Sequence, residues 1–257
     1  MNEKNRQKLK VKYAGAISTG LVLIFGFAIV LPGVIYKSSK DAYTPADQSQ
    51  FKRVMLAFSV HDMLNLPNWC NDLSSFLKSN QIKATIFVTG YVAEKYPNCV
   101  TSFSYNSDID IGSQTYSYVD LVSDINYPDA LLDIQKGKNT IDDIGNLSSK
   151  LFKSPYGSVD QNIYSLLNRS GIIADFSYKD HYNKYERGMF VKHNLNEYEP
   201  NTISFKQLPK IDVPYIVNFN NTVPLEKITS HISKLKLDKD INFVTASELT
   251  GLKLTVR

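Results

Sequence analysis

The sequence contains few of the side chains that bind metals or form cross-links. Its 257 residues include 4 His and 2 Cys. Cys70 and Cys99 allow one disulfide at most, and two buried free thiols are the alternative. His181, His193 and His231 lie at no spacing typical of metal ligands, and the last is expected on the surface of a helix.

Internal repeats and long low-complexity runs are also absent, which argues against solenoid and propeller architectures. Hydrophobic residues make up 43% of the chain and aromatic residues 12%, so a sizeable core is expected and disorder is not. At this length the chain can hold one large α/β domain or two small ones.

Most of the chain has no excess of positive or negative charge. Residues 1–12 carry five basic residues and one Glu, and their net charge of +4 equals that of the whole protein. Residues 37–257 therefore hold the other 24 of the 29 basic residues and the other 24 of the 25 acidic residues. This balance argues against a surface that binds nucleic acid.

The one long apolar run, residues 13–36, contains 24 residues without a charged side chain. As a helix it would be about 36 Å long, enough to cross a bilayer core of about 30 Å. Because no clear cleavage site follows, we predict an uncleaved transmembrane anchor. The basic tail, residues 1–12, then stays inside, and a linker (37–50) leads to an extracytoplasmic domain (51–257). The predicted location is the cytoplasmic or plasma membrane, with a single pass.

An exported domain can be glycosylated at asparagine. Asn146, Asn168 and Asn220 each begin an Asn-x-Ser/Thr triplet. These triplets can carry a glycan only if the host glycosylates exported chains, and they also arise by chance.

The exported part alternates between apolar runs typical of buried strands and amphipathic stretches typical of helices. This alternation predicts parallel strands with helices outside them, as a barrel or a wound sheet. Residues 181–209 break the rhythm and are predicted to form long loops. Strands are expected within 53–60, 82–89, 108–114, 150–153, 172–178 and 213–219, helices after Pro67, Pro128, Val159 and Pro224, and a short strand and helix within 241–252.

Three segments resemble, in order and spacing, motifs of the polysaccharide deacetylase (NodB-homology) family. They are KATIFVTGYVAEKYP from Lys83, DIGSQTYSYVDL from Asp110 and FKSPYGSVD from Phe152. The resemblance covers residues 53–252. It implies an α/β fold, a distorted (β/α) barrel of about seven parallel strands, with the active groove at their carboxyl ends. It also implies hydrolysis of carbohydrate N-acetyl groups by a metal-activated water.

The residues at the family's catalytic positions differ in type from those that the family uses. The general base, an Asp in the family, falls on Ser59, and the metal-binding Asp falls on Val60 or His61. The two metal-binding His fall on Gln114 and Tyr118. An amide oxygen binds divalent ions weakly, and Tyr binds well only after losing a proton with a pKa near 10.

One motif of the family is kept. Tyr156, whose counterpart donates its backbone N–H to the oxyanion, stands in a Pro-Tyr-Gly turn. The family's Arg falls on Lys153, which keeps the charge but loses the forked geometry. The late His that protonates the leaving amine falls on Asn218 or Asn220, and neither can act as a general acid.

A rebuilt metal site is the alternative. His61 and Asp62 lie at the end of the first strand, and Asp110, Tyr118 and Asp120 could lie nearby. The simpler interpretation makes His61 a hydrogen-bonded groove residue.

Other candidate residues are carboxylates and tyrosines that follow the later strands. Asp175 and Asp180 are interpreted as loop carboxylates, because no acid remains for them to tune. Four tyrosines either stack on sugar rings or, as we prefer, pack as half-buried side chains. They are Tyr178, Tyr182, Tyr185 and Tyr198.

The leading hypothesis is a membrane-anchored, catalytically degenerate deacetylase-like protein that binds envelope glycan or acts as a scaffold. It has no expected cofactor, and its groove would contain His61, Asp62, Gln114, Tyr118 and Tyr156. The first alternative is an active amide or ester hydrolase with a rebuilt, zinc-like site at His61. The second is an accessory subunit that binds a membrane protein partner.

Overall fold

The structure of the chain is a computed structural model that describes residues 52–177, 184–186, 189–191, 196–198 and 215–251. The predicted tail, anchor and linker, residues 1–50, lie outside these ranges. None of the described helices is long and apolar enough to cross a membrane.

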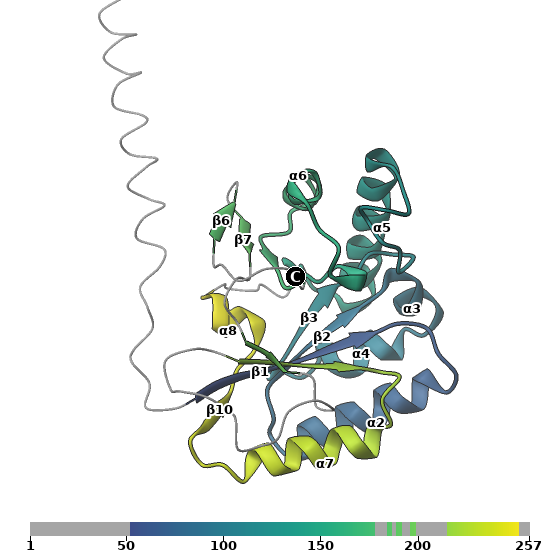
Figure 1. Cartoon of the computed structure of the whole chain (residues 1–257). Helices are drawn as coiled ribbons and strands as arrows, with labels where there is room; N and C mark the ends of the chain where they lie inside the picture. The colour runs from purple at the N-terminus through teal and green to yellow at the C-terminus, as the bar shows by residue number, and fades with distance from the viewer. Residues whose placement is uncertain (1–51, 178–183, 187–188, 192–195, 199–214, 252–257) are drawn as a thin grey trace, which may run out of the picture. The chain divides into compact units, whose positions relative to one another are not determined.

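Ten strands form one sheet at the centre of the described unit (Figure 1). They are β1 (Lys52–Val60), β2 (Ala84–Val88), β3 (Ile109–Ser113), β4 (Leu151–Phe152), β5 (Ala174–Asp175), β6 (Lys184–Glu186), β7 (Met189–Val191), β8 (Asn196–Tyr198), β9 (Tyr215–Asn220) and β10 (Ile241–Phe243). Their order is β6-β7-β5-β4-β3-β2-β1-β9-β8, and β10 also pairs with β1. Every pair is parallel except β6–β7.

The parallel α/β class predicted from the alternation is confirmed. In the described part of the chain the sheet has ten strands instead of about seven, and no pairing joins β6 to β8. One detail of the prediction is wrong. Residues 181–209, predicted as loops, contain β6, β7 and β8, which are three residues long each.

In the described residues, eight helical segments lie between or after the strands. They are α2 (Leu66–Ser79), α3 (Gly90–Lys95), α4 (Asn98–Ser104), α5 (Tyr127–Gly145), the 3-10 turn η1 (Pro155–Gly157), α6 (Gln161–Arg169), α7 (Leu225–Lys236) and α8 (Ala246–Thr250). Prolines lie in the first turn of α2 and α5 and at the N-cap of α7, where a missing N–H costs nothing. The short helices α3 and α4 were not predicted.

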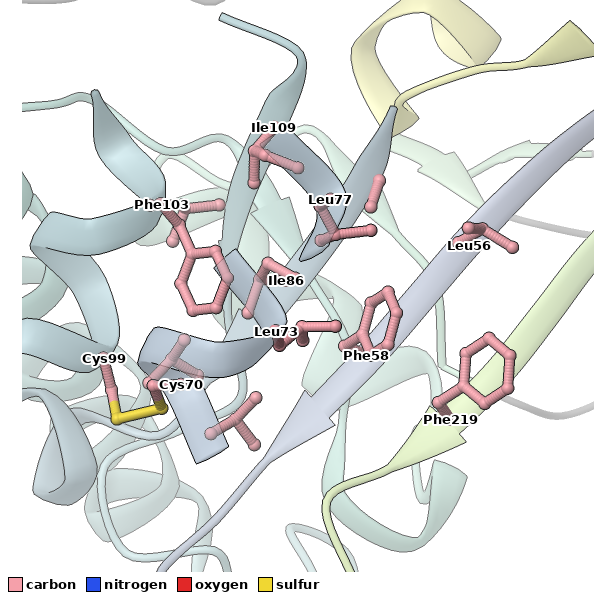
Figure 2. Close-up of a cluster of buried hydrophobic side chains, with 14 of the residues drawn as sticks. Leu56, Phe58, Cys70, Leu73, Leu77, Ile86, Cys99, Phe103, Ile109 and Phe219 are labelled. Atoms are coloured by element: carbon pink, nitrogen blue, oxygen red, sulfur yellow. A yellow bond between two sulfur atoms is a disulfide. The ribbon is translucent and has the colours of Figure 1, made fainter. Parts of the chain in front are cut away.

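Both faces of the sheet are buried, which explains the continuous apolar run of β1. Side chains alternate along a strand, so Phe58 and Val60 pack toward α2, whereas Met55 and Ala57 pack on the opposite face. Figure 2 shows Leu56 and Phe58 on the α2 side, among side chains from α2, β2 and β9.

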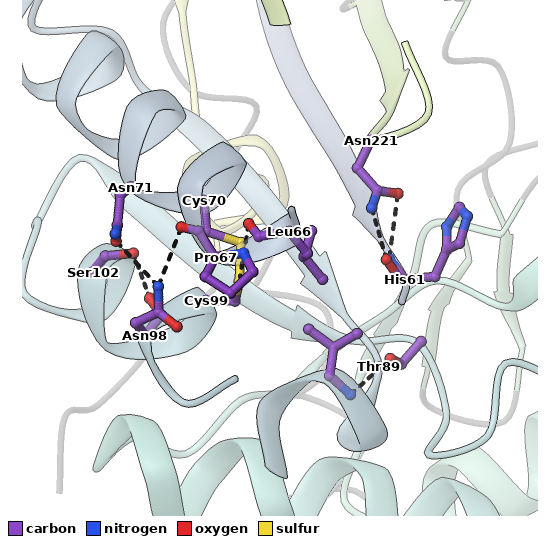
Figure 3. The surroundings of a disulfide bond; sticks show 11 residues. His61, Leu66, Pro67, Cys70, Asn71, Thr89, Asn98, Cys99, Ser102 and Asn221 are labelled. Carbon is purple, nitrogen blue, oxygen red and sulfur yellow. Dashed lines mark hydrogen bonds between the residues drawn. A yellow bond between two sulfur atoms is a disulfide. The ribbon is translucent and has the colours of Figure 1, made fainter. Parts of the chain in front are cut away.

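A disulfide joins Cys70 in α2 to Cys99 in α4, with the two Cα atoms 5.2 Å apart (Figures 2 and 3). Both cysteines are fully buried. Of the two alternatives open from the sequence, the structure therefore has the disulfide.

Candidate functional site

The carboxyl ends of the central strands meet at one edge of the sheet. Val60 of β1 pairs with Val88 of β2, Val88 with Ser113 of β3, and Ser113 with Phe152 of β4. On the other side of β1, Ser59 pairs with Asn220 of β9. The segments that follow these strands therefore lie together at this edge, as expected for a parallel sheet.

The alternation of side chains decides which residue of β1 corresponds to the metal-binding Asp of the family. Val60 is fully buried in the apolar core on the α2 side. His61 lies beside Tyr118, with 4.6 Å between the ring centroids and 23° between the ring planes. His61, not Val60, thus faces the loop after β3.

Ser59 and Gln114 contact each other across β2, which separates β1 from β3. Gln114 Nε2 donates a hydrogen bond to Ser59 Oγ at 3.2 Å. Gln114 is only 1% exposed, and its Oε1 atom has no hydrogen-bond partner among the described residues. The two positions that hold the base and a metal-binding His in the family are therefore joined by a buried polar contact.

His61 is fixed by its main chain. Asn221 Nδ2 donates to the His61 carbonyl oxygen at 2.7 Å, and Asn221 Oδ1 accepts from the His61 N–H at 3.4 Å (Figure 3). Asn221 is buried directly after β9. This clamp holds the His61 backbone beside the end of β9, although His61 is no longer in the β1 ladder.

Three rings form a row at the edge: His61, Tyr118 and Tyr156. Tyr118 stacks on His61 and lies 5.4 Å from Tyr156, between ring centroids. Tyr156 is 69% exposed and presents most of its ring to solvent.

Burial keeps the first two of these rings neutral. It lowers the pKa of His61 from its ordinary 6.5, and the negative charge of Asp62 opposes this change only in part. Burial also raises the pKa of Tyr118 above 10, and Tyr156 adds to the rise. At neutral pH the site therefore presents an imidazole and a phenol without charge.

The loop after β3 is held in an unusual backbone conformation. Thr115 has φ 82° and Tyr118 has φ 61°, a region that costs non-glycine residues energy. Asp133 of α5 accepts hydrogen bonds from the N–H of Tyr116 at 3.0 Å and from the Ser117 hydroxyl at 2.5 Å. Gly137 lets this loop lie directly on α5, because a Cβ there would collide with the backbone of Thr115. These contacts position the Tyr118 ring.

Lys153 and Asn218 connect two distant strands. Lys153 follows β4, and its Nζ donates to Asn218 Oδ1 of β9 at 2.6 Å. In the sheet order, β3, β2 and β1 lie between these strands, so this contact spans the inner side of the curved edge. The Lys and Asn that stand at the family's Arg and at one of its two candidate His positions are thus hydrogen-bonded partners.

Two of the carboxylates named for a rebuilt metal site, Asp110 and Asp62, interact with other residues instead. Asp110, near the start of β3, accepts from the N–H and hydroxyl of Ser247 in α8. Asp62 forms an ion pair with Lys95 at 2.8 Å. Within the described ranges, no three His, Cys, Asp or Glu side chains form a group that could hold a metal ion.

The Asp120 carboxylate accepts hydrogen bonds from its own loop. It accepts from the backbone N–H groups of Val122 and Ser123 at 2.9 and 3.1 Å. Burial alone would raise its pKa, but hydrogen bonds from Ser158, Val122 and Ser123 lower it on balance.

Asp175 is a residue whose role the sequence interpretation missed. It was expected in a loop, but it lies in β5 and is completely buried. Its Oδ1 accepts from the N–H and hydroxyl of Ser177, and Ser177 Oγ accepts from the Ser154 N–H at 2.6 Å. Asp175 therefore supports the turn that carries Tyr156. A lone carboxylate inside the apolar run IIADF was the available signal.

Two further expectations concern residues away from this edge. His231, expected on the surface of a helix, is half-buried beside Phe219, with 6.0 Å between the ring centroids. It lines a cavity of about 410 Å³ on α7. Asp180, Tyr178 and Tyr182 lie outside the described residues.

Comparisons with known proteins agree with the motifs. The model of a family described as polysaccharide deacetylase matches residues 46–174, half of the chain. Peptidoglycan-N-acetylglucosamine deacetylase from Bacillus cereus is 31% identical over 122 residues, 48% of this chain and 43% of that protein. The chain thus spans less than half the length of that relative.

Solved structures with the same fold are less similar in sequence. A CE4 family pseudoenzyme from Bacillus anthracis has a TM-score of 0.58 and 17% identity, over 80% of this chain and 66% of that one. A mutant of it has restored enzymatic activity. Peptidoglycan deacetylase PdaC from Bacillus subtilis has a TM-score of 0.57 and 18% identity, over 80% and 93% of the two chains. At these identities the likeness shows the fold alone.

Proposed function

This chain belongs to the polysaccharide deacetylase family, and we propose that it binds glycan of the cell envelope without hydrolysing it. The buried hydrogen bond between Gln114 and Ser59 is the observation that carries this proposal. A serine hydroxyl is no general base without a partner that takes its proton, and a glutamine amide cannot take one.

The donor set at this edge does not fit the divalent metal that the family implies. A metal site of this kind needs ionised carboxylates or neutral imidazoles. Tyr118 stays a neutral phenol because burial raises its pKa, and Asp62 is paired with Lys95. Among the described residues His61 is then a single ligand, which is too few for a stable site.

The same edge has the features of a carbohydrate-binding surface. The rings of His61, Tyr118 and Tyr156 form an apolar row, while Ser59 and Gln114 supply polar atoms beside it. Binding sites for small polar ligands combine aromatic walls with a few placed hydrogen-bonding groups. Sugar rings, which are apolar on their faces and polar at their rims, match this combination.

The proposed location is the outer side of a membrane. The uncharged run of residues 13–36 and the basic tail before it favour an anchor whose N-terminus stays inside. Two of the proteins named above, from Bacillus cereus and Bacillus subtilis, are peptidoglycan deacetylases by their descriptions, so envelope glycan is the ligand class we propose.

The test is a binding and turnover measurement on the full-length chain in detergent. We expect it to bind insoluble peptidoglycan in the presence of EDTA, and mass spectrometry to find no loss of acetyl groups. Tyr156→Ala should weaken binding about tenfold, or about 1.4 kcal/mol. Tyr105→Ala, which changes an 89% exposed tyrosine at the end of α4, is the matched control.

Each failure of this test favours a different alternative. Acetyl loss that EDTA stops and His61→Ala abolishes would contradict the proposal in favour of a rebuilt hydrolase. A folded protein that binds no glycan, and that copurifies with a membrane protein, would favour the accessory subunit.

A further inference from the structure

Three helices end together at the edge of the sheet opposite to the candidate site. Because the strands are parallel, α2, α4 and α7 return from the carboxyl ends and end at the amino edge, before β2, β3 and β10. Ser74 of α2 donates to the Ser102 carbonyl oxygen of α4 at 2.7 Å. Lys236 Nζ, at the end of α7, donates to the Asn80 carbonyl oxygen, directly after α2, at 2.8 Å. In Figure 1, α2 and α7 lie on the same side of the sheet, so their ends are neighbours.

Two large apolar side chains are exposed at these helix ends. Tyr105 directly follows α4 and is 89% exposed, and Leu237 directly follows α7 and is 80% exposed. Neither belongs to the apolar core clusters of the described residues. Helices commonly end at Gly or Asn, as α8 does at Gly251 and α5 at Asn146, so a helix end does not require an apolar side chain. Packing of the fold therefore does not account for these two side chains.

Basic side chains lie around Leu237 and at the end of α2. The exposed ones are Lys78, Lys234, Lys236 and Lys239. Residues 234–240 also contain Asp240 and Asp238, and Asp238 is paired with Lys52 at 3.0 Å. Lysines are common at the carboxyl ends of helices, where they complement the helix dipole, but here they accompany exposed apolar side chains. We call the four lysines, Tyr105 and Leu237 the amino-edge surface.

The opposite edge of the sheet carries negative charge in the loop after β3. Residues 114–129 contain three Asp and no basic side chain, and the three are Asp120, Asp124 and Asp129. Asp160, at the N-cap of α6, is a fourth carboxylate at this edge. An anionic surface therefore attracts the amino-edge surface and repels these loops of the candidate site.

The chain enters the domain at the amino edge. Lys52, the first residue of β1, pairs with Ile241, the first residue of β10. The predicted anchor ends at residue 36, and an extended chain of the length of residues 37–51 spans about 50 Å at most. A domain held on such a tether has its amino edge within reach of the membrane.

We propose that the amino-edge surface binds an anionic phospholipid surface, with the Tyr105 and Leu237 side chains among the headgroups and the lysines on the lipid phosphates. This inference rests on the proposed location in the membrane. Tyrosine is enriched where membrane and water meet, and lysine extends its charge to the headgroups while its stem covers apolar surface. The candidate site then faces away from the membrane, toward the envelope glycan.

The experiment uses the full-length chain reconstituted into vesicles whose lipids carry bromine on their acyl chains, because bromine quenches tryptophan that lies at the membrane. The vesicles contain phosphatidylcholine alone, or equal parts of phosphatidylcholine and phosphatidylglycerol. Leu237→Trp should lose fluorescence relative to vesicles without bromine, and should lose more in the mixed vesicles. The matched control is Leu64→Trp, at an 84% exposed leucine between β1 and α2, which should lose none. The wild-type chain, in which the single tryptophan, Trp69, is buried, gives the background.

The contribution of the lysines is measured in the Leu237→Trp chain. Lys234→Gln together with Lys239→Gln should reduce the loss of fluorescence in the mixed vesicles to that in phosphatidylcholine alone. Lys227→Gln, at an exposed lysine in the first turn of α7, should leave the loss unchanged. Salt at about 1 M, which screens charges beyond about 3 Å, should act like the double substitution.

The outcomes separate this inference from the location on which it rests. Equal loss of fluorescence in Leu237→Trp and Leu64→Trp, or no loss in either, overturns the proposal when the chain floats with the vesicles. Cross-linking of the chain to itself without any loss would assign the surface to a second copy. Equal loss in both kinds of vesicle, unchanged by the lysine substitutions, overturns the preference for anionic lipid. A folded chain that does not float with vesicles overturns the membrane location, while glycan binding is measured separately in detergent.

Discussion

This chain keeps the family's residue types in the turn after β4 but has other residue types at the ends of β1 and β3. The turn keeps the Pro-Tyr-Gly residues of the family and a strained Tyr156 with φ 58°. At the ends of β1 and β3 the strands are still in register, but Ser59, His61, Gln114 and Tyr118 stand at positions that bind metal or move protons in the family.

This difference teaches that the backbone of this edge and its side-chain chemistry depend on different parts of the chain. The turn is supported from below by hydrogen bonds of Asp175 and Ser177. At the positions where the family has its catalytic side chains, this chain has a buried hydrogen bond and a ring stack. The strained backbone of the turn is the feature that it shares with the family's motif.

The largest effect on stability is expected from a residue pair that belongs to neither region. Replacing both Cys70 and Cys99 by Ser opens a loop with a sequence separation of 29 residues. The free energy of unfolding should fall by about 3 kcal/mol, as measured in urea. Glycan affinity at a temperature where both forms are folded should not change. A parallel loss of affinity would show that the groove depends on the cross-link.

At the ends of β1 and β3, the hydrogen bond between Gln114 and Ser59 is the contact to remove by mutation. Gln114→Ala leaves the buried Ser59 hydroxyl without its partner and creates a cavity. We expect the free energy of unfolding to fall by about 1–3 kcal/mol. Gln161→Ala, on the exposed face of α6, is the control and should change it by less than about 0.5 kcal/mol. An equal effect of the two would mean that the contact contributes nothing.

At the Pro-Tyr-Gly turn, two variants separate the effect of backbone strain on stability from the effect of the Tyr156 ring on glycan binding. Tyr156→Ala and Tyr156→Gly both remove the ring, so both should lose glycan affinity. Glycine tolerates a positive φ, so Tyr156→Gly should be more stable than Tyr156→Ala by about 1 kcal/mol. Chemical denaturation of the two proteins gives this difference. Equal stability would argue against strain at this residue.

The smallest expected effect is a pH dependence from His61. Burial lowers its pKa in the folded state below the ordinary 6.5, so the unfolded chain binds more protons near and below that pH. Stability should therefore fall as the pH drops below about 6.5. His61→Phe should lose less stability than wild type between pH 7.5 and 5, by urea unfolding. Burial also lowers the pKa of His231, which stays in both proteins and so cancels in the comparison.

Much of the fold could be predicted from the sequence, because long amphipathic helices that begin at Pro67, Pro128 and Pro224 are visible in the pattern. The helices α3 and α4 could not, since each is short and Pro97 interrupts the stretch between them. Three-residue strands such as β6 carry no alternation that a pattern could detect.

Only part of the candidate site could be predicted from the sequence. The sequence left Val60 and His61 as alternatives, because β1 is apolar on both faces and hides the alternation that separates them. The alternative of a rebuilt metal site allowed Asp110 near His61, but Asp110 lies near the amino end of β3 and accepts hydrogen bonds from α8. The support of the turn by Asp175 depends on a contact between β5 and the β4 loop, which sequence spacing does not encode.

Zinc stoichiometry tests the central claim most directly. The full-length chain in detergent is loaded with zinc and dialysed, and the metal that remains is measured per protein. The positive control is the variant with Ser59→Asp, His61→Asp, Gln114→His and Tyr118→His. The account predicts that this variant retains about one equivalent, while wild type retains no more than His61→Ala does. About one equivalent in wild type, lost in His61→Ala, would contradict the account.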